Sequence, residues 1–185
     1  MGAQAPHSDR YSRAVVYACR KHEGHTRDDN KTPYAVHPVR VCEHLRRIAG
    51  EEDENVLCAA LLHDTIEDAA VTFDNIASNF GGDVAALVSE LTNDNRLPKA
   101  RRRSEMMEKL TKLSPRAKRV KLADRLDNVL DLLNGMGTPE KHVRYADETA
   151  RLLTACAGAC KPLEDTLKDA LEKLRQMNAQ MFDRS

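Results

Sequence analysis

Apolar residues recur along the chain at spacings of three and four, and no stretch alternates between apolar and polar residues in the manner of a strand. The clearest stripe consists of Val120, Ala123, Leu126, Leu130 and Leu133. Spacings of three and four place side chains on one face of an α-helix. The pattern therefore predicts an all-α protein.

Capping residues, prolines and glycines predict where the helices begin and end. We expect one helix over about residues 8–23 and the next from His37-Pro38 to about Gly50. Further helices are expected to begin at Asp53 or Glu54, Thr72, Asp83, about residue 100, Ser114-Pro115, Thr138-Pro139 and Pro162. The result is a compact bundle of about eight helices. We expect it to form one domain over residues 8–178, between flexible termini at 1–7 and 179–185.

The composition narrows the class of protein. The chain has 185 residues, with 29 Lys and Arg against 29 Asp and Glu. A net charge of zero argues against nucleic-acid binding, which needs a basic surplus. No apolar run approaches the ~18–20 residues of a membrane span, and the N-terminus lacks the apolar region of a signal peptide. We therefore expect a cytoplasmic protein. Its five cysteines form no CxxC pair, so they indicate neither a disulfide framework nor a zinc ribbon.

A run of seven apolar residues, 56–62, leads directly into His63 and Asp64. Such a run is typical of a helix buried on most sides. An imidazole and a carboxylate at its end cost several kcal/mol unless they are paired, hydrogen-bonded or bound to a metal. Taken alone, a His–Asp pair that caps the core explains this feature as well as a metal site does.

Two further residues change that balance. Asp124 lies beside the apolar stripe, with Asn128 four residues later on the same edge of the helix. His37 lies in the first turn of a helix that follows a polar segment, residues 25–36. Each alone has an ordinary explanation, as a boundary carboxylate or a capping histidine. Together with His63 and Asp64 they offer a nitrogen and oxygen donor set that suits Mn, Fe, Ni or Zn.

In this order, His37, the pair His63-Asp64 and Asp124 resemble the H…HD…D pattern of HD-domain metal-dependent phosphohydrolases. The segments TPYAVHPVRV, ALLHDTIED and VKLADRLDNV are similar to the hydrolase domain of the RelA/SpoT family. The segment ELTNDNRLPKARR is especially like the stand-alone small alarmone hydrolases of that family, metazoan members included. The similarity covers about residues 8–175.

The resemblance implies a hydrolase that removes pyrophosphate from the ribose 3′ position of guanosine alarmones, (p)ppGpp, and releases GDP or GTP. It implies that Mn²⁺ is held by His37, His63, Asp64 and Asp124. A divalent cation balances buried carboxylates and lowers the pKa of a bound water, which fits this reaction. The resemblance further implies that Glu67 and Asp68 are catalytic, as general acid or base.

The same resemblance implies a set of substrate-binding residues, Arg27, Tyr34, Lys99, Asn128 and Tyr145. Lys99 belongs to a basic cluster with Arg96, Arg101, Arg102 and Arg103. We expect Lys99 to contact phosphate, and Arg102 and Arg103 to lie on a solvated helix face.

The sequence departs from the family pattern at two positions. Asp28 follows Arg27, where the family often has lysine, and Lys31 is the candidate to replace the missing cation. Asp127 precedes Asn128, where the family has an aromatic residue or histidine. We expect both changes to affect substrate preference more than metal binding.

Two other functions remain open from the sequence. The same chemistry would serve an HD phosphohydrolase that acts on NADPH or another nucleoside phosphate. A nucleotide-binding module with an inactive site is the second alternative, although the presence of every expected ligand and of Glu67-Asp68 counts against it. The chain has no room for a synthetase domain beside the hydrolase, so we expect hydrolysis without the switching that such domains impose.

Overall fold

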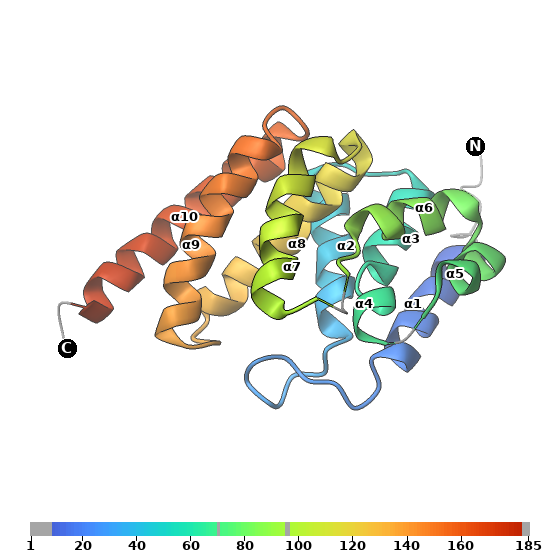
Figure 1. The fold of residues 1–185 in the computed structure, drawn as a ribbon, viewed down its shortest axis with the longest axis horizontal. Helices are drawn as coiled ribbons and strands as arrows, with labels where there is room; N and C mark the ends of the chain where they lie inside the picture. The colour runs from blue at the N-terminus through green and yellow to red at the C-terminus, as the bar shows by residue number, and fades with distance from the viewer. Residues whose placement is uncertain (1–8, 70, 95–96, 183–185) are drawn as a thin grey trace, which may run out of the picture.

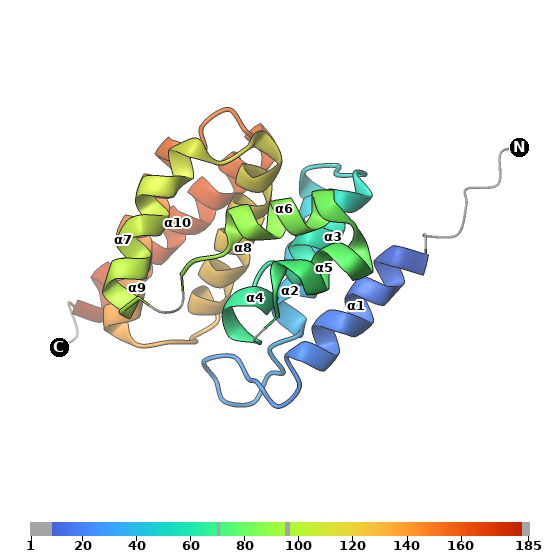
Figure 2. The ribbon, with the colours of Figure 1, turned by 45° about the vertical axis from the view of Figure 1, so that its right-hand side comes forward.

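The computed structural model describes residues 9–69, 71–94 and 97–182, and these residues form helices and no strand. The elements are α1 (Asp9–Lys21), α2 (Val36–Ile48), α3 (Glu54–Leu62), α4 (Thr65–Asp68), α5 (Phe73–Phe80), α6 (Gly82–Leu91), α7 (Lys99–Lys109), the 3₁₀ helix η1 (Leu110–Lys112), α8 (Pro115–Leu133), α9 (Pro139–Ala155) and α10 (Lys161–Phe182). The all-α prediction is confirmed. Along the longest axis, α1 and α5 lie at one end and α9 and α10 at the other (Figures 1 and 2).

The capping residues act as the sequence predicts. The side chains of Asp53, Ser114 and Thr138 each accept a hydrogen bond from a backbone N–H in the first turn of α3, α8 and α9. Thr72 forms a reciprocal capping box with Asn75 at the start of α5. These bonds satisfy donors that the first helical turn leaves without partners.

Three differences from the predicted elements stand out. Helix α4 was not predicted. The basic helix expected near residues 100–112 ends at Lys109 and continues as η1. The predicted domain boundary at residue 178 falls inside α10, which runs to Phe182. The expected N-terminal segment 1–7 lies outside the described residues.

Helix α3 forms the centre of the core. Every residue from Val56 to Leu62 is at most 7% exposed, as the apolar run predicts. The helix packs against α1, α2 and α6, and α8 packs against α2 and α10. Each buried Val or Leu contributes about 1.5–3 kcal/mol of transfer free energy. This packing fixes the end of α3 beside the first turn of α2 and the middle of α8.

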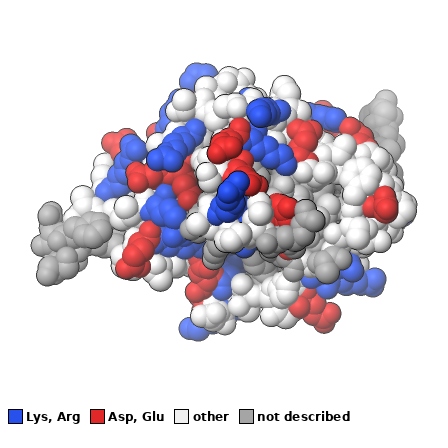
Figure 3. Space-filling view, viewed as in Figure 1, with Lys and Arg blue, Asp and Glu red and all other residues white. Residues whose placement is uncertain are grey.

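The surface seen in Figure 3 carries acidic and basic side chains intermingled rather than one field of a single sign. Within the described part of the chain, no helix combines the length and the apolar character needed to cross a membrane. The five cysteines are free, and Cys156 is fully buried and packs as a small apolar residue.

Candidate active site

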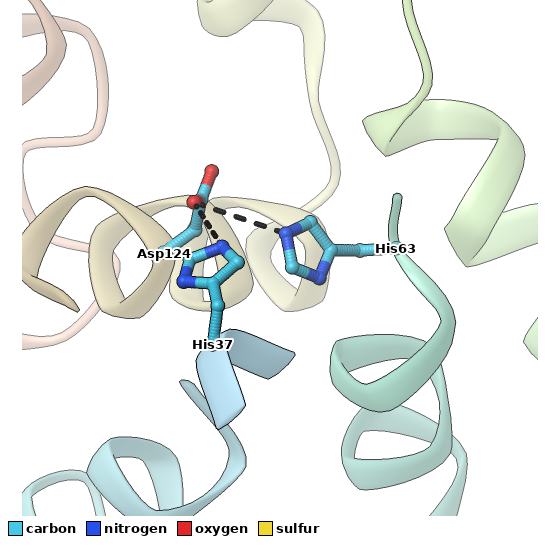
Figure 4. Close-up of side chains that lie close together, drawn as sticks. All are labelled: His37, His63 and Asp124. Carbon is cyan, nitrogen blue, oxygen red and sulfur yellow. Dashed lines mark ion pairs between the residues drawn. The ribbon is translucent and has the colours of Figure 1, made fainter. Parts of the chain in front are cut away.

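Three helices bring the predicted metal ligands together. His37 projects from the first turn of α2, His63 from the end of α3 and Asp124 from the middle of α8, and all three side chains point toward one another (Figure 4). Each offers a ligand atom within 4.8 Å of the others. Asp64, between α3 and α4, joins this group through contacts to both imidazoles. The predicted ligand residues therefore converge.

The two carboxylates lie close to the two imidazole Nε2 atoms. Asp124 Oδ1 is 3.3 Å from His37 Nε2 and 3.8 Å from His63 Nε2. Asp64 Oδ2 is 3.1 Å from His63 Nε2 and 3.7 Å from His37 Nε2. The hydroxyl of Tyr34 donates a 2.6 Å hydrogen bond to the same Asp64 oxygen. Nitrogen and oxygen donors thus face one small volume.

The orientation of His63 suits a metal ligand. Its Nδ1 lies 2.8 Å from the backbone oxygen of Ala60, a bond that directs Nε2 toward Asp64 and Asp124. This Nε2 is buried, yet it makes no hydrogen bond of proper geometry within the described structure. A buried polar atom without such a bond is costly, and a bound cation would satisfy it. Two imidazoles and two carboxylates form a donor set that first-row transition metals accept, so the residues fit a metal.

Charge interactions link the two imidazoles and the two carboxylates. Burial by itself would lower the pKa of His63, but the carboxylates of Asp64 and Asp124 outweigh it and raise that pKa to about 10. The pKa of His37 is raised as well, because its bonds to Asp124 and Asp127 outweigh burial. The pKa of Asp124 is held well below its usual value, against burial, by Lys121 and the two histidines.

The predicted catalytic residue Glu67 lies on α4 at the wall of a cavity. Its Oε2 accepts hydrogen bonds from the backbone N–H and the side-chain amide of Asn93, at 3.2 and 3.0 Å. Its Oε1 lies 3.3 Å from Arg102 Nη1. Arg102 therefore lines the cavity, and its predicted place on a solvated face is wrong. The sequence shows Arg102 only as part of a basic run, whereas the structure places its guanidinium beside Glu67 of α4.

Three of the predicted ligands, His37, Asp64 and Asp124, line one cavity of about 500 Å³ together with Glu67. Arg27 and Asn128 line it, and Arg27 Nη2 donates to Asn128 Oδ1 at 2.9 Å. The amide of Asn128 donates to Asp124 Oδ1 at 2.7 Å, which confirms that these two residues share an edge of α8. The Arg27 guanidinium also lies 5.4 Å from the ring centre of Tyr34. The cavity is thus continuous from the metal group to a cationic and aromatic wall.

Helix α9 forms the opposite wall. The ring of Tyr145 has three cations close to it, with Arg125 at 4.5 Å, Lys141 at 5.1 Å and Arg144 at 5.7 Å from the ring centre. Lys141 forms an ion pair with Asp28 of the loop before α2. This pair joins the two sides of the cavity and neutralises one of its cations.

Not every predicted residue reaches the site. Lys31 is exposed and is not among the residues that line the cavity. Asp68 ends α4 and Lys99 begins α7, but the side chains of both, like that of Arg103, lie outside the described residues. Arg96 lies outside them altogether. The expected roles of Asp68 and Lys99 stay predictions.

The structure adds cavity residues that the sequence did not single out. They are Asn93, Met106, Met107, Lys121, Arg125, Lys141, Arg144 and Glu148. On α9, Lys141 lies four residues before Tyr145 and Glu148 three residues after it, spacings that could have found them once Tyr145 was chosen, whereas Arg144 directly precedes Tyr145. Lys121 lies one turn before Asp124, and its Nζ is 3.0 Å from Asp124 Oδ2.

The fold and the site define the class of protein. Residues 14–159 match the family model of the HD domain, and the chain belongs to the HD-domain family. It is similar to the guanosine-3′,5′-bis(diphosphate) 3′-pyrophosphohydrolase MESH1 of Mus musculus, 40% identical over 164 residues that cover 86% of this chain and 92% of the mouse protein. The Homo sapiens protein of the same name is 42% identical over 159 residues, covering 84% of this chain and 89% of its own.

A solved structure agrees with these relatives. It is described as a metazoan ortholog of SpoT that hydrolyzes ppGpp and plays a role in starvation responses. It matches this fold with a TM-score of 0.87 at 35% identity, over 92% of this chain and 98% of that chain. The resemblance to the RelA/SpoT hydrolases that the sequence motifs indicated is confirmed.

Proposed function

We propose that this chain removes the 3′-pyrophosphate of guanosine 3′,5′-bis(diphosphate) and of its 5′-triphosphate form, giving GDP or GTP and pyrophosphate. The observation that carries this proposal is one cavity in which the imidazole and carboxylate group, Glu67 and cations from two walls face each other. Similarity to the mouse and human pyrophosphohydrolases along most of the chain supports the same substrate. We assign its place of action to the cytoplasm, and we propose one hydrolase domain that begins at about residue 8 and ends with α10 rather than at residue 178.

We infer that His37, His63, Asp64 and Asp124 would hold one Mn²⁺. When bound, such an ion supplies Lewis acidity and a water of lowered pKa. Tyr34 orients Asp64 through a hydrogen bond of 2.6 Å. Asn128 orients Asp124 through a hydrogen bond of 2.7 Å. Bonds of this kind fix the direction of a ligand before the ion arrives.

The reaction needs two proton transfers. A water oxygen attacks the phosphorus next to the ribose 3′ oxygen, and the bond between that phosphorus and the 3′ oxygen breaks. The nucleotide leaves with its 3′ oxygen, and the pyrophosphate that is released carries the oxygen of the water. The water gives up a proton, and the 3′ oxygen of the ribose takes one. Glu67 lies in the cavity with a carboxylate fixed by Asn93 and Arg102, so we assign it the proton of the attacking water. Asp68 remains the candidate for the second transfer.

The cations of the cavity suit a substrate with several phosphates. Arg102 and Lys121 lie beside Glu67 and Asp124, where negative charge develops on the transferred phosphoryl group. Preorganised cations at such a position stabilise the transition state. The cations around Tyr145 on α9 lie on the other wall and suit the remaining diphosphate.

The test compares ppGpp and NADPH as substrates of the metal-free protein after addition of Mn²⁺, with pyrophosphate and orthophosphate measured separately. We expect pyrophosphate and GDP from ppGpp, at a rate well above any release of orthophosphate from NADPH. Orthophosphate from NADPH with no turnover of ppGpp would keep the metal site and contradict the substrate. Mn²⁺ binding without turnover of either substrate would favour a binding module.

A further inference from the structure

Asp127 on α8 is a buried carboxylate outside the cavity. Its side chain is 1% exposed, and it is not among the residues that line the cavity. Substrate therefore does not reach it. A buried carboxylate destabilises the fold unless cations and hydrogen bonds compensate for its lost hydration, so its contacts indicate its role.

The contacts of Asp127 lead to the metal group. Its Oδ2 lies 2.6 Å from His37 Nδ1, the ring nitrogen that faces away from Asp64 and Asp124. The Nε2 atom of the same ring lies 3.3 Å from Asp124 Oδ1. One ring nitrogen therefore faces Asp127 and the other faces the metal group. A hydrogen bond to one nitrogen decides which nitrogen carries the proton and which offers a lone pair to a metal.

We propose that Asp127 is a positioning residue of the metal centre, which holds the ring and the proton of His37 so that Nε2 is free to bind the ion. This inference rests on the metal site proposed above. The two histidine ligands are oriented by different devices, because His63 Nδ1 faces the neutral carbonyl of Ala60. A carboxylate acceptor makes an imidazole a more basic ligand than a carbonyl does.

Arg40 holds Asp127 in turn. It lies one turn after His37 on α2, and its Nε is 2.7 Å from Asp127 Oδ1. Its Nη2 donates to Asp127 Oδ2 at 3.0 Å and to Asp131 Oδ1 at 2.7 Å. The same guanidinium thus bridges two carboxylates one turn apart on α8. Arg40 therefore contacts both oxygens of Asp127.

Asp131 gives the inference a matched control. It is 4% exposed, shares Arg40 with Asp127 and receives a 2.8 Å hydrogen bond from Arg27 Nε. It has the same charge, similar burial and a common partner, but no histidine contact is recorded for it among the described residues. Replacement of Asp131 therefore removes a comparable buried carboxylate and leaves the His37 orientation in place.

The experiment measures Mn²⁺ binding to chelator-stripped protein by titration calorimetry, without substrate. We expect Asp127→Asn and Asp127→Ala to weaken Mn²⁺ binding about 10- to 100-fold, with the alanine variant the weaker of the two. Loss of a bond that orients a metal ligand is what weakens Mn²⁺ binding, and Asp131 makes no such bond to His37. Asp131→Asn is therefore expected to bind Mn²⁺ within about twofold of the wild type. Thermal unfolding of the metal-free variants reports separately on a general loss of stability. Such a loss lowers the melting temperature but leaves the Mn²⁺ affinity of the folded protein unchanged.

Each outcome decides between the two proposals. If wild-type protein binds no Mn²⁺, both the metal site and this inference are overturned. If the wild type binds Mn²⁺ and folded Asp127→Ala binds it equally well, only the role of Asp127 is wrong. Should the Asp127 variants fail to fold, imidazole ¹⁵N spectra of the wild type loaded with diamagnetic Zn²⁺ decide the question. We expect a proton on His37 Nδ1, and a proton on Nε2 would overturn the inference.

Discussion

Arg102 Nη1 on α7 lies 3.3 Å from the carboxylate of Glu67 on α4, across the wall of the cavity. Together with Asn93 it holds both oxygens of Glu67. An acid fixed in this way keeps its position relative to the metal group through each cycle, which favours proton transfer over a fixed distance. In the proposed reaction, helix α7 therefore supplies a residue that positions Glu67 and no metal ligand.

Replacement of Glu67 by glutamine is expected to lower kcat about 10²-fold or more, because the amide cannot accept the proton of the attacking water. Mn²⁺ affinity is expected to stay at the wild-type value, since none of the proposed ligands changes. Steady-state kinetics with ppGpp and a calorimetric Mn²⁺ titration measure the two quantities. A nearly unchanged kcat would mean that Glu67 has a structural role and does not transfer the proton.

Replacement of a metal ligand is expected to remove both activity and metal-dependent stability. For the wild type, Mn²⁺ at 100 times its dissociation constant adds about 2.7 kcal/mol to the free energy of unfolding. His63→Ala and Asp64→Ala are expected to lose this increment and all turnover. Differential scanning calorimetry of stripped protein, with and without Mn²⁺, measures it.

His142→Ala is the matched control for this experiment. His142 is also buried, and its Nε2 lies 2.8 Å from the Met136 carbonyl rather than at the metal group. The variant is expected to be less stable at every Mn²⁺ concentration and to keep the Mn²⁺-dependent increase. Turnover by His63→Ala at the wild-type rate after chelation would contradict the metal site.

Local signals in the sequence predicted most of the fold. Capping residues such as Thr72 and Ser114 mark helix starts because their side chains satisfy donors within three residues. Helix α4 escaped prediction because its four residues follow α3 with no glycine or proline between them. The chain turns at His63 and Asp64, and that turn is set by tertiary contacts of the buried end of α3.

The site could be predicted where the sequence places polar side chains directly after a run of buried apolar residues. His63 and Asp64 follow an apolar run, so the need for a partner is visible in the sequence. The partners of Asp127 and Arg27 are not visible, because His37 is 90 residues from Asp127 and Arg27 is 104 residues from Asp131. The expectation that the Asp127 departure affects substrate preference more than metal binding does not match its place beside His37. Packing of α2 against α8 brings His37 to Asp127, and the loop before α2 brings Arg27 to Asp131.

The ion pair between Asp28 and Lys141 leads to a prediction about the KM for ppGpp. Asp28→Asn is expected to free Lys141 and to lower KM for ppGpp up to about fivefold, the value of an exposed pair worth about 0.2–1 kcal/mol. The decrease is expected to shrink as salt rises, because salt screens exposed charges. Initial rates at low and high salt measure it.

Asp165→Asn serves as the control for the Asp28 variant. Asp165 also pairs with a lysine, Lys161, but both residues are on α10 and neither lines the cavity. Its replacement is expected to leave KM unchanged at every salt concentration. An equal KM for Asp28→Asn and wild type at low salt would mean that Lys141 does not meet the substrate.

The loop that carries Arg27 predicts a response to acid. Asp29 accepts hydrogen bonds from the Thr32 hydroxyl and from the backbone N–H groups of Thr32 and Lys31, and these bonds lower its pKa from 3.8 to about 2. Because the folded value is the lower one, the bonds stabilise the loop above pH 3.8 and this contribution is lost as the pH falls toward 2.

A carboxyl ¹³C titration of Asp29 is therefore expected to have its midpoint near 2 in the wild type and to move toward 3.8 in Thr32→Ala. Thr166→Ala, which removes a hydroxyl bonded to Pro162 on α10, is expected to leave the Asp29 midpoint in place. A wild-type midpoint at 3.8 would mean that the loop does not form these bonds in solution, and the position of Arg27 at the cavity would then need another cause.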